Sequence, residues 1–211
     1  MQARRISREL ALLGLSQLSE KPSKKALDLD ALVLAAVRTL TTEAQETLEA
    51  AAAELRQSDT HLMESETRTT DVETARQMLA SAIAKTEAAI NRLGSALEIP
   101  EFLQIANRKE VRHYAQELVS NALTYRIEVD EQLNQAMVAW QVKRLARIDR
   151  DILRIAVVEI EYLGVPNRVA INEAIEIAKR YSGDEGFRFI NGVLRRVTDQ
   201  IKQNRRSAQP L

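Results

Sequence analysis

Apolar residues recur every three or four positions through the last third of the chain and predict three consecutive helices. The first stripe ends at Gly164 and Pro166, and the second ends at Ser182 and Gly183. Asp184 is expected to cap the start of the third helix. Helices joined by connections this short pack as antiparallel neighbours. The three stripes are Ile152, Ile155, Ala156, Ile160 and Leu163; Ile171, Ala174, Ile175, Ala178 and Tyr181; and Ile190, Val193, Leu194, Val197 and Ile201.

The residues that divide a chain into many short strands are scarce. Six Gly and four Pro occur among 211 residues, and aromatic residues make up 4% of the sequence, which excludes an all-β sandwich or barrel. No segment of useful length alternates between apolar and polar residues, so a doubly wound sheet with a ligand site at its switch point is also excluded. The sequence therefore predicts an all-α fold.

The first hundred residues follow the helical spacing less regularly. A short amphipathic helix is expected over residues 3–18, and a second helix is expected to begin at Asp28 or Asp30. The polar stretch 58–71 contains six Ser or Thr and is expected to be a loop before a third helix over 72–97. The second and third helices would then form a helical hairpin.

Charge is distributed unevenly, although the formal net charge is zero. Residues 1–25 hold six Lys or Arg against two acids, and residues 188–206 hold six against one. Residues 40–100 hold eleven acids against five bases, so the predicted hairpin is acidic and would repel phosphate. Basic ends around an acidic middle suit a polyanion bound to one surface, but charged helix faces also occur simply as solvated surfaces.

The residue types that build most catalytic and metal sites are few. The sequence has no Cys, which excludes disulfides, thiol nucleophiles and cysteine-ligated metals, and it has two histidines, His61 and His113. No pair of acids is placed for general acid–base work, so we expect a non-enzymatic protein without a cofactor or a metal. The longest apolar run, residues 31–37, is too short to span a membrane, and a soluble cytoplasmic protein is expected.

Several segments resemble the hallmark sequences of the NusB family of transcription antitermination factors. They are the Val-Pro pair at 165–166, VAINEA at 169–174, FINGVL at 189–194, the arginine-rich ARRISRELA at 3–11, and the helix at 149–160. The two long motifs occur in the order and at the separation that the family has. The resemblance covers residues 2–19 and roughly 107–203.

This coverage predicts a domain organisation. Residues 1–19 and 107–203 are expected to form a NusB-like RNA-binding domain, with 204–211 as a polar C-terminal tail. Residues 20–106 exceed what a compact family member has after its first helix, so they are expected to be an acidic helical insertion.

The resemblance implies a fold of two small antiparallel helical bundles and a role in transcription. Members of the family bind the boxA element of nascent single-stranded RNA together with NusE, a small-subunit ribosomal protein. The pair joins other Nus factors on the RNA polymerase elongation complex, notably on ribosomal RNA operons. A similar bundle also forms the N-terminal domain of ribosomal RNA cytosine methyltransferases, so a stand-alone relative of that domain is an alternative. The glycine-rich loop and catalytic cysteine of those enzymes are missing here.

The first helix carries the strongest candidate RNA-binding residues. Arg4 and Arg8 are expected on the face opposite its core stripe, with Arg5 beside them, so that three guanidinium groups face water together. Arginine can hold a phosphate in a bidentate manner and can also stack on an unpaired base. A solubilising face is the alternative interpretation. The core stripe is Ile6, Leu10 and Leu13.

A second group of candidate RNA-binding residues lies near the start of the last helix. Glu185, Arg188 and Phe189 are assigned there by their positions in the family motif. Phe189 could stack on a base beside the basic helix start, or it could pack at the edge of the core.

A protein-interaction scaffold that does not bind RNA is a further alternative. Leu12 and Leu15 are expected on the same outward face as the arginines, where an apolar patch beside a polar rim would mark a partner site. The acidic hairpin could instead cover these two residues.

Overall fold

The structure, a computed structural model, describes residues 2–18, 28–67, 71–97, 104–137, 141–183 and 185–207. No β-strand occurs among these residues, which confirms the predicted all-α fold. By contacts the chain divides into two compact units, residues 1–36 with 106–211 and residues 37–105. The helices are α1 (Gln2–Gln17), α2 (Leu29–Thr67), α3 (Val72–Leu97), α5 (Lys109–Thr124), α6 (Arg126–Ala136), the short η1 (Val142–Arg144), α7 (Arg147–Glu161), α8 (Asn167–Tyr181) and α9 (Gly186–Ser207).

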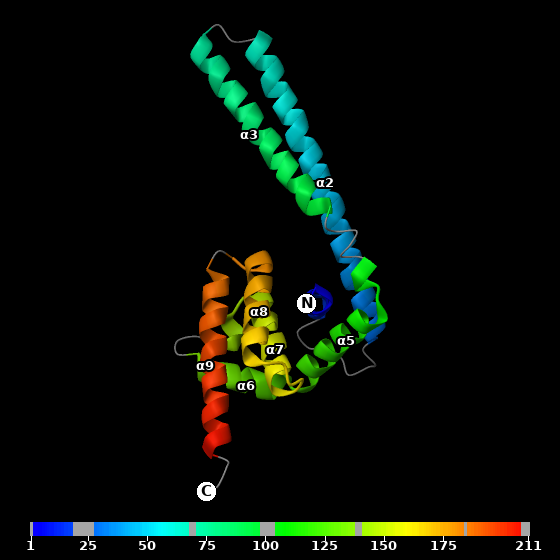
Figure 1. The fold of residues 1–211 in the computed structure, drawn as a ribbon, viewed down its shortest axis with the longest axis vertical. Helices are drawn as coiled ribbons and strands as arrows, with labels where there is room; N and C mark the ends of the chain where they lie inside the picture. Colours follow the sequence, from blue (N-terminus) through cyan, green and yellow to red (C-terminus); the bar gives the residue numbers. More distant parts are fainter. Residues whose placement is uncertain are drawn as a thin grey trace. The chain divides into compact units, whose positions relative to one another are not determined.

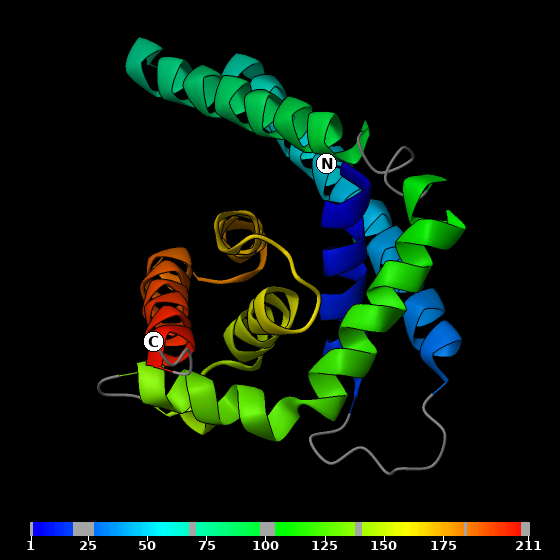
Figure 2. The same cartoon turned by 60° about the horizontal axis from the view of Figure 1, so that its bottom comes forward.

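Helix α1 is an internal helix of the first unit. It contacts both α5 and α7, and Figure 2 shows it running alongside α5. Every residue from Ile6 to Leu15 is buried, so the predicted stripe of Ile6, Leu10 and Leu13 is confirmed. Ala11, Leu12 and Leu15 form a second buried face and belong to the main apolar cluster of the unit. Because apolar side chains occupy both faces, α1 is covered on both sides.

Helices α7, α8 and α9 pack against one another, and Figure 1 shows α8 and α9 side by side. The predicted core residues of α9 are buried, and so are four of the five predicted for α7, with Leu163 half-buried. On α8 the prediction is correct for Ala174 and Ala178. The other three predicted residues, Ile171, Ile175 and Tyr181, are half-buried, and Ile177 is buried instead.

The turn between α7 and α8 depends on Gly164. Its φ of 65° lies in the left-handed region, which glycine adopts without strain. The Val165 N–H donates to the Glu159 carbonyl at 2.9 Å and fastens the turn to the end of α7. Pro166 directly precedes α8, as the sequence predicts.

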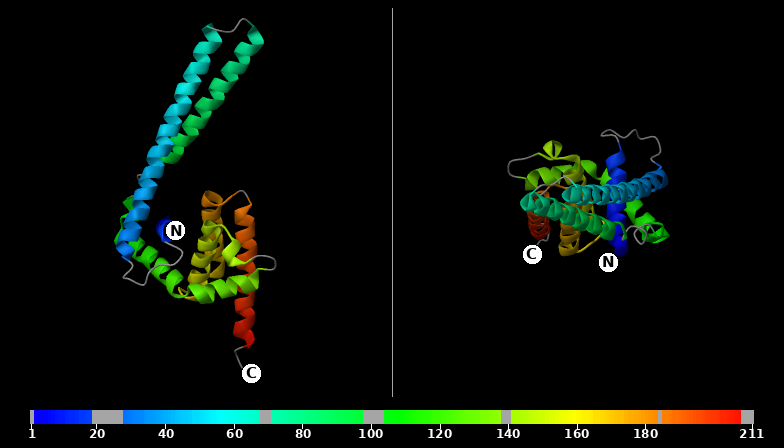
Figure 3. Two further views of the ribbon diagram at one scale, coloured as in Figure 1. Left: turned by 180° about the vertical axis from the view of Figure 1, so that it is seen from behind. Right: turned by 90° about the horizontal axis from the view of Figure 1, so that it is seen from above.

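The second unit contains a hairpin of α2 and α3, which Figure 1 shows side by side and Figure 3 shows from two further directions. The seam is made of small residues, and Ala51, Ala82 and Ala89 are buried there. The Ser58 hydroxyl donates to the Ala82 carbonyl at 2.8 Å across the seam. Small side chains allow the two helices to approach closely. The predicted acidic helical hairpin is present.

The predicted loop over residues 58–71 is wrong, because α2 continues to Thr67. Hydroxyl groups in this stretch bond within their own helix: Thr60 donates to the Arg56 carbonyl at 3.0 Å, and Thr67 donates to the Met63 carbonyl at 2.7 Å. Serine and threonine can therefore extend a helix when their hydroxyls bond back to the preceding turn.

Asp28 caps α2 as predicted, since its carboxylate accepts the Ala31 N–H at 3.0 Å. Asp71 caps α3 in the same way, with the Thr74 N–H at 2.7 Å. The hydrogen bond from this backbone N–H lowers the pKa of Asp71. The predicted cap at Asp184 lies outside the described residues. In the described part of the chain, no helix combines the length and apolar character needed to cross a membrane.

Candidate nucleic-acid interface

The side chain of Arg8 is buried, so the predicted surface of three exposed arginines is wrong for this residue. Arg8 is 4% exposed, and its Nε lies 2.9 Å from both carboxylate oxygens of Glu159 on α7. Its terminal nitrogen also lies 3.4 Å from a carboxylate oxygen of Glu173 on α8. The physical reason is the internal position of α1, which leaves little of its surface to water.

Glu159 is the acceptor that Arg8 requires. It is 1% exposed and also accepts the hydroxyl of Tyr114 on α5 at 2.6 Å. A buried carboxylate is tolerated only when a positive partner and hydrogen bonds compensate for lost water, and both are present here. We call Arg8, Tyr114, Glu159 and Glu173 the Arg8 cluster. It joins α1, α5, α7 and α8.

Sequence reasoning missed Glu159, although a signal was present. Glu159 follows Ile155 and Ala156 at the four- and three-residue spacing of the α7 stripe, where an apolar residue is expected. A carboxylate in such a position indicates a buried charge with a partner elsewhere in the chain.

The phenol of Tyr114 is held in its neutral form. Burial raises its pKa well above the usual range, and the hydrogen bond to Glu159 and that carboxylate's charge raise it further. A group with a raised pKa in the folded state contributes stability that is fully present below its unfolded pKa, about 10 for tyrosine, and is lost as the pH rises beyond that value.

We therefore expect alkaline pH to destabilise the protein partly through Tyr114. Between pH 10 and pH 11 the free energy of unfolding should fall by up to about 1.4 kcal/mol more in the parent than in Tyr114→Phe, because one proton is coupled to folding. Urea unfolding at several pH values measures both slopes. Equal slopes would show that Tyr114 ionises as readily in the folded protein as in the unfolded chain.

Arg5 and Arg4 are the more accessible arginines of α1. The Arg5 side chain is 46% exposed, and its Nε lies 3.2 Å from Glu173. Its hydrogen bond to Glu173 raises the pKa of Arg5. Arg4 is exposed, and its guanidinium carbon lies 3.6 Å from the centroid of the Tyr114 ring. The cation–π contact holds Arg4 above Tyr114.

A groove of about 600 Å³ opens beside these residues within the first unit. One part of its wall is basic and aromatic, formed by Arg4, Arg8 and Tyr114. The rest comes from the turn after α7 and the start of α8, and includes the exposed amide of Asn172. We call this the Arg4 groove. Its remaining lining residues are Leu163, Gly164, Val165, Pro166, Val169 and Glu173.

Leu12 and Leu15 do not form an exposed partner site. They are 0% and 6% exposed and belong to the main apolar cluster of the first unit, so the expected outward-facing patch is wrong. Their side chains pack in the interior because α1 contacts both α5 and α7.

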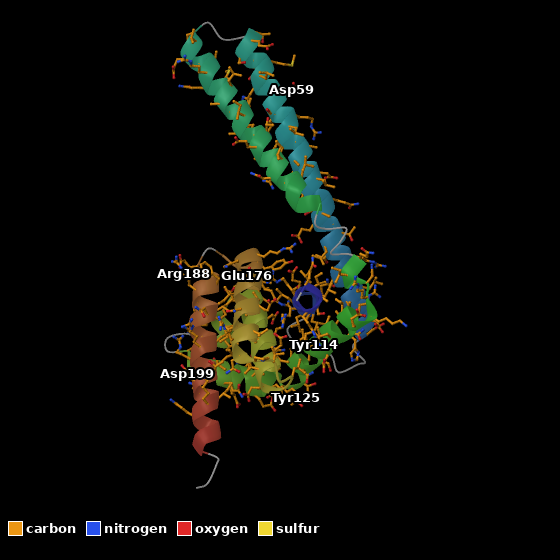
Figure 4. All side chains as sticks on the ribbon, in the orientation of Figure 1. Asp59, Tyr114, Tyr125, Glu176, Arg188 and Asp199 are labelled. Carbon is orange, nitrogen blue, oxygen red and sulfur yellow. The ribbon has the colours of Figure 1, made fainter. Side chains whose placement is uncertain are left out.

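The second group of predicted residues lies at the start of α9. Arg188 and Glu185 are exposed and form a local ion pair at 3.0 Å. Phe189 is half-buried and packs against the main cluster. In Figure 4, Arg188 on α9 and Tyr114 on α5 lie on separate sides of the first unit. The structure therefore places Arg4 and Arg8 of α1 at the same groove, whereas the predicted residues of α9 do not line that groove.

The described residues form an all-helical fold with a groove that offers one exposed guanidinium, that of Arg4, beside a largely apolar wall. The sequence model of the NusB family matches residues 66–199, more than half of the chain. The "Transcription antitermination protein NusB" of Crocosphaera subtropica is 54% identical over 204 residues, covering 96% of this chain and 98% of that protein. The protein of the same name from Trichormus variabilis is 59% identical over 199 residues, covering 93% and 94%.

The chain belongs to the NusB family of transcription antitermination proteins, which is a non-enzymatic family. Because these two relatives align over nearly the whole chain, their alignments take in most or all of the hairpin segment. Among solved structures, T. maritima NusB is 23% identical, covers 72% of this chain and 90% of its own, and has a TM-score of 0.43.

Proposed function

We propose that this protein acts in transcription antitermination by binding boxA-like single-stranded RNA in the Arg4 groove, together with NusE. The context we propose is cytoplasmic transcription of ribosomal RNA operons, with other Nus factors on the RNA polymerase elongation complex. Membership of the NusB family supports the general role.

One observation carries the choice of site. Arg4 is exposed, it is held on the Tyr114 ring at 3.6 Å, and it lines a groove large enough for an unpaired base. A guanidinium held in place offers N–H donors to a phosphate with little loss of side-chain entropy. Arg5 adds a second exposed cation one residue further along the same helix.

The rest of the groove suits the other parts of a nucleotide. Val165, Pro166 and Val169 offer apolar surface for the face of a base, and the Asn172 amide offers both donors and acceptors. Arg8 has a different role in this proposal. Its pairing with Glu159 fixes α1 against α7 and so positions Arg4 and Arg5.

The test is a fluorescence titration of labelled boxA-like RNA and scrambled RNA of the same length, with and without purified NusE. We expect tighter binding of boxA-like RNA, a further gain when NusE is present, and a steep loss of affinity with added salt. Equal affinity for both RNAs at every salt concentration would contradict the proposal. Binding of NusE without any RNA binding would instead indicate a protein-interaction scaffold.

Phe189 provides a separate prediction about the extent of the site. If the RNA strand continues to the start of α9, replacing Phe189 with Leu removes a flat stacking surface but keeps most of the apolar volume. We expect RNA affinity to fall by about 1–3 kcal/mol with little change in the melting temperature. Binding isotherms and thermal unfolding measure the two quantities.

Leu123→Ala is the control for lost core packing, because Leu123 is also half-buried and packs against the main cluster but lies on α5 and not at the start of α9. It should leave RNA affinity unchanged. If Phe189→Leu lowers the melting temperature and leaves RNA affinity unchanged, Phe189 is a core residue and the α9 group is not part of the site.

A further inference from the structure

The hairpin of the second unit exposes a set of large aliphatic side chains on both of its helices. Each leaves between 39% and 60% of its surface in water. Apolar groups scattered singly on a surface need no explanation, but a contiguous set along two helices indicates a contact surface. The residues are Leu48, Leu55 and Leu62 on α2, and Leu79, Ile83, Ile90 and Leu93 on α3.

These residues share one face of the hairpin. Leu48, Leu55 and Leu62 are spaced by seven, and so are Ile83 and Ile90, which keeps each series on one side of its helix. At 100° per residue, the series on α2 is rotated from the seam residue Ala51 in the same sense as the series on α3 is rotated from Ala82. In an antiparallel pair of helices this places both series on the same side of the hairpin. The opposite side is polar. It carries the Glu54–Arg92 ion pair at 2.9 Å and the Lys85–Gln57 hydrogen bond at 2.8 Å.

The face is large enough for a stable interface. It extends along α3 from Val72 to Leu93. Val72 is also exposed and precedes Leu79 by seven residues. At 1.5 Å per residue this is about 30 Å, and the width of two helices is about 20 Å. That is an area of about 600 Å² in projection, comparable with the accessible surface of about 800 Å² that each partner buries in a standard interface. Seven-residue spacing on both helices is typical of a helical-bundle seam.

We infer that this face binds the same face of a second copy of the chain and forms a four-helix bundle around a two-fold axis parallel to the hairpin. A two-fold interface requires a self-complementary surface, and an apolar face meeting itself meets this requirement. In this arrangement α2 of one copy lies antiparallel to α3 of the other at the same level. The inference rests on the hairpin alone and is independent of the proposed RNA site.

Charge complementarity supports this arrangement. The Ser58–Ala82 and Ser58–Thr86 contacts fix which residues of α2 and α3 stand at the same level. By that register, Glu66 stands level with Arg76, and Arg56 stands level with Glu87. All four are exposed at the rims of the apolar face. Each rim of the bundle would therefore pair opposite charges from different copies, and a pairing of this kind sets orientation.

The first test is the dissociation constant of the dimer, measured by sedimentation equilibrium on the full chain. Ile83→Glu should weaken association by at least about 100-fold, because the two-fold axis places the substitution in the interface twice. Ala84→Glu is the matched control. Ala84 is the next residue of α3, is exposed and lies outside the face, so this variant should associate like the parent. Helix content by circular dichroism shows whether each variant is folded.

Charge reversal tests the arrangement without touching the apolar residues. Arg76→Glu alone places two carboxylates opposite each other at this level of the rim, and Glu66→Arg alone places two guanidinium groups there. Each variant should therefore self-associate about tenfold more weakly than the parent. An equimolar mixture of the two should regain the parent's association, since each copy then supplies the charge that the other needs. Recovery on mixing is possible only if the pair forms between chains.

A parent chain that stays monomeric at high micromolar concentration would overturn the inference, as would Ile83→Glu associating as tightly as Ala84→Glu. Failure of the mixture to regain association would overturn the two-fold arrangement. A dimer that is insensitive to all of these substitutions would place the contact elsewhere on the chain.

Discussion

Replacing Arg8 with Ala is expected to lower the free energy of unfolding by about 3–5 kcal/mol. The stability is lost because Glu159 remains buried without its positive partner. Glu159 would keep its negative charge in a site that is 1% exposed, with the Tyr114 hydroxyl as its remaining neutral partner in the Arg8 cluster. Removing one member of a buried pair leaves an uncompensated charge, which costs far more than the pair itself contributes.

Arg5→Ala is the matched control for this prediction. Arg5 also pairs with a carboxylate, but its side chain is 46% exposed, so its loss should cost less than about 1 kcal/mol. The double variant Arg8→Met with Glu159→Gln should recover more than half of the lost stability, because it removes both charges and keeps an acceptor for Tyr114. Urea unfolding measures all three. A loss for Arg8→Ala no greater than that for Arg5→Ala would show that the Arg8 cluster is not a buried ionic network.

The helices near the C-terminus could be predicted because their signals are local. Apolar spacing within α9 depends on that helix alone, and the predicted residues Ile190, Leu194 and Ile201 are buried. The end of α7 also follows from local chemistry, since Gly164 adopts the left-handed conformation and Pro166 precedes the next helix. These elements needed no knowledge of what they pack against.

Helix α1 was predicted less well because its environment is set by distant parts of the chain. Its amphipathic pattern correctly placed Ile6 and Leu10 in the core. The pattern does not reveal that α7 covers the other side, which buries Leu12 and Arg8 as well. Apolar residues on both faces of a helix indicate that it is internal, and the leucines that suggested a partner surface are the sign of this burial.

The polar end of α2 shows a different kind of error. Serine and threonine are typical of loops, but Ser58 here bridges to the Ala82 carbonyl of a neighbouring helix that lies 24 residues away in sequence. A small polar residue at a helix seam can have the composition of a loop and the geometry of a core. Sequence spacing alone does not separate the two.

The second large effect is expected for RNA binding. The double substitution of Arg4 and Arg5 by Ala removes the two accessible cations of α1 together with their contacts to Tyr114 and Glu173, but it keeps the buried pair of Arg8 and Glu159. If each arginine contacts one phosphate, affinity for boxA-like RNA should fall at least about 30-fold at low salt, and the slope of log affinity against log salt should flatten by about 1.4 for single-stranded RNA. The free energy of unfolding should change by less than about 1.5 kcal/mol.

The central claim is that Arg4, which lines the Arg4 groove, and the neighbouring exposed Arg5 bind single-stranded RNA. Its most direct measurement is the salt dependence of boxA-like RNA binding, compared between the parent and the Arg4→Ala, Arg5→Ala double variant in the presence of NusE. Lys179→Ala is the control, because Lys179 is an exposed cation that pairs with Glu176 on α8 and does not line the groove. For the double variant we predict a lower affinity for RNA and a flatter slope of log affinity against log salt. For the control we predict that both quantities are unchanged. Parallel salt slopes and equal affinities for the parent and the double variant would contradict the account.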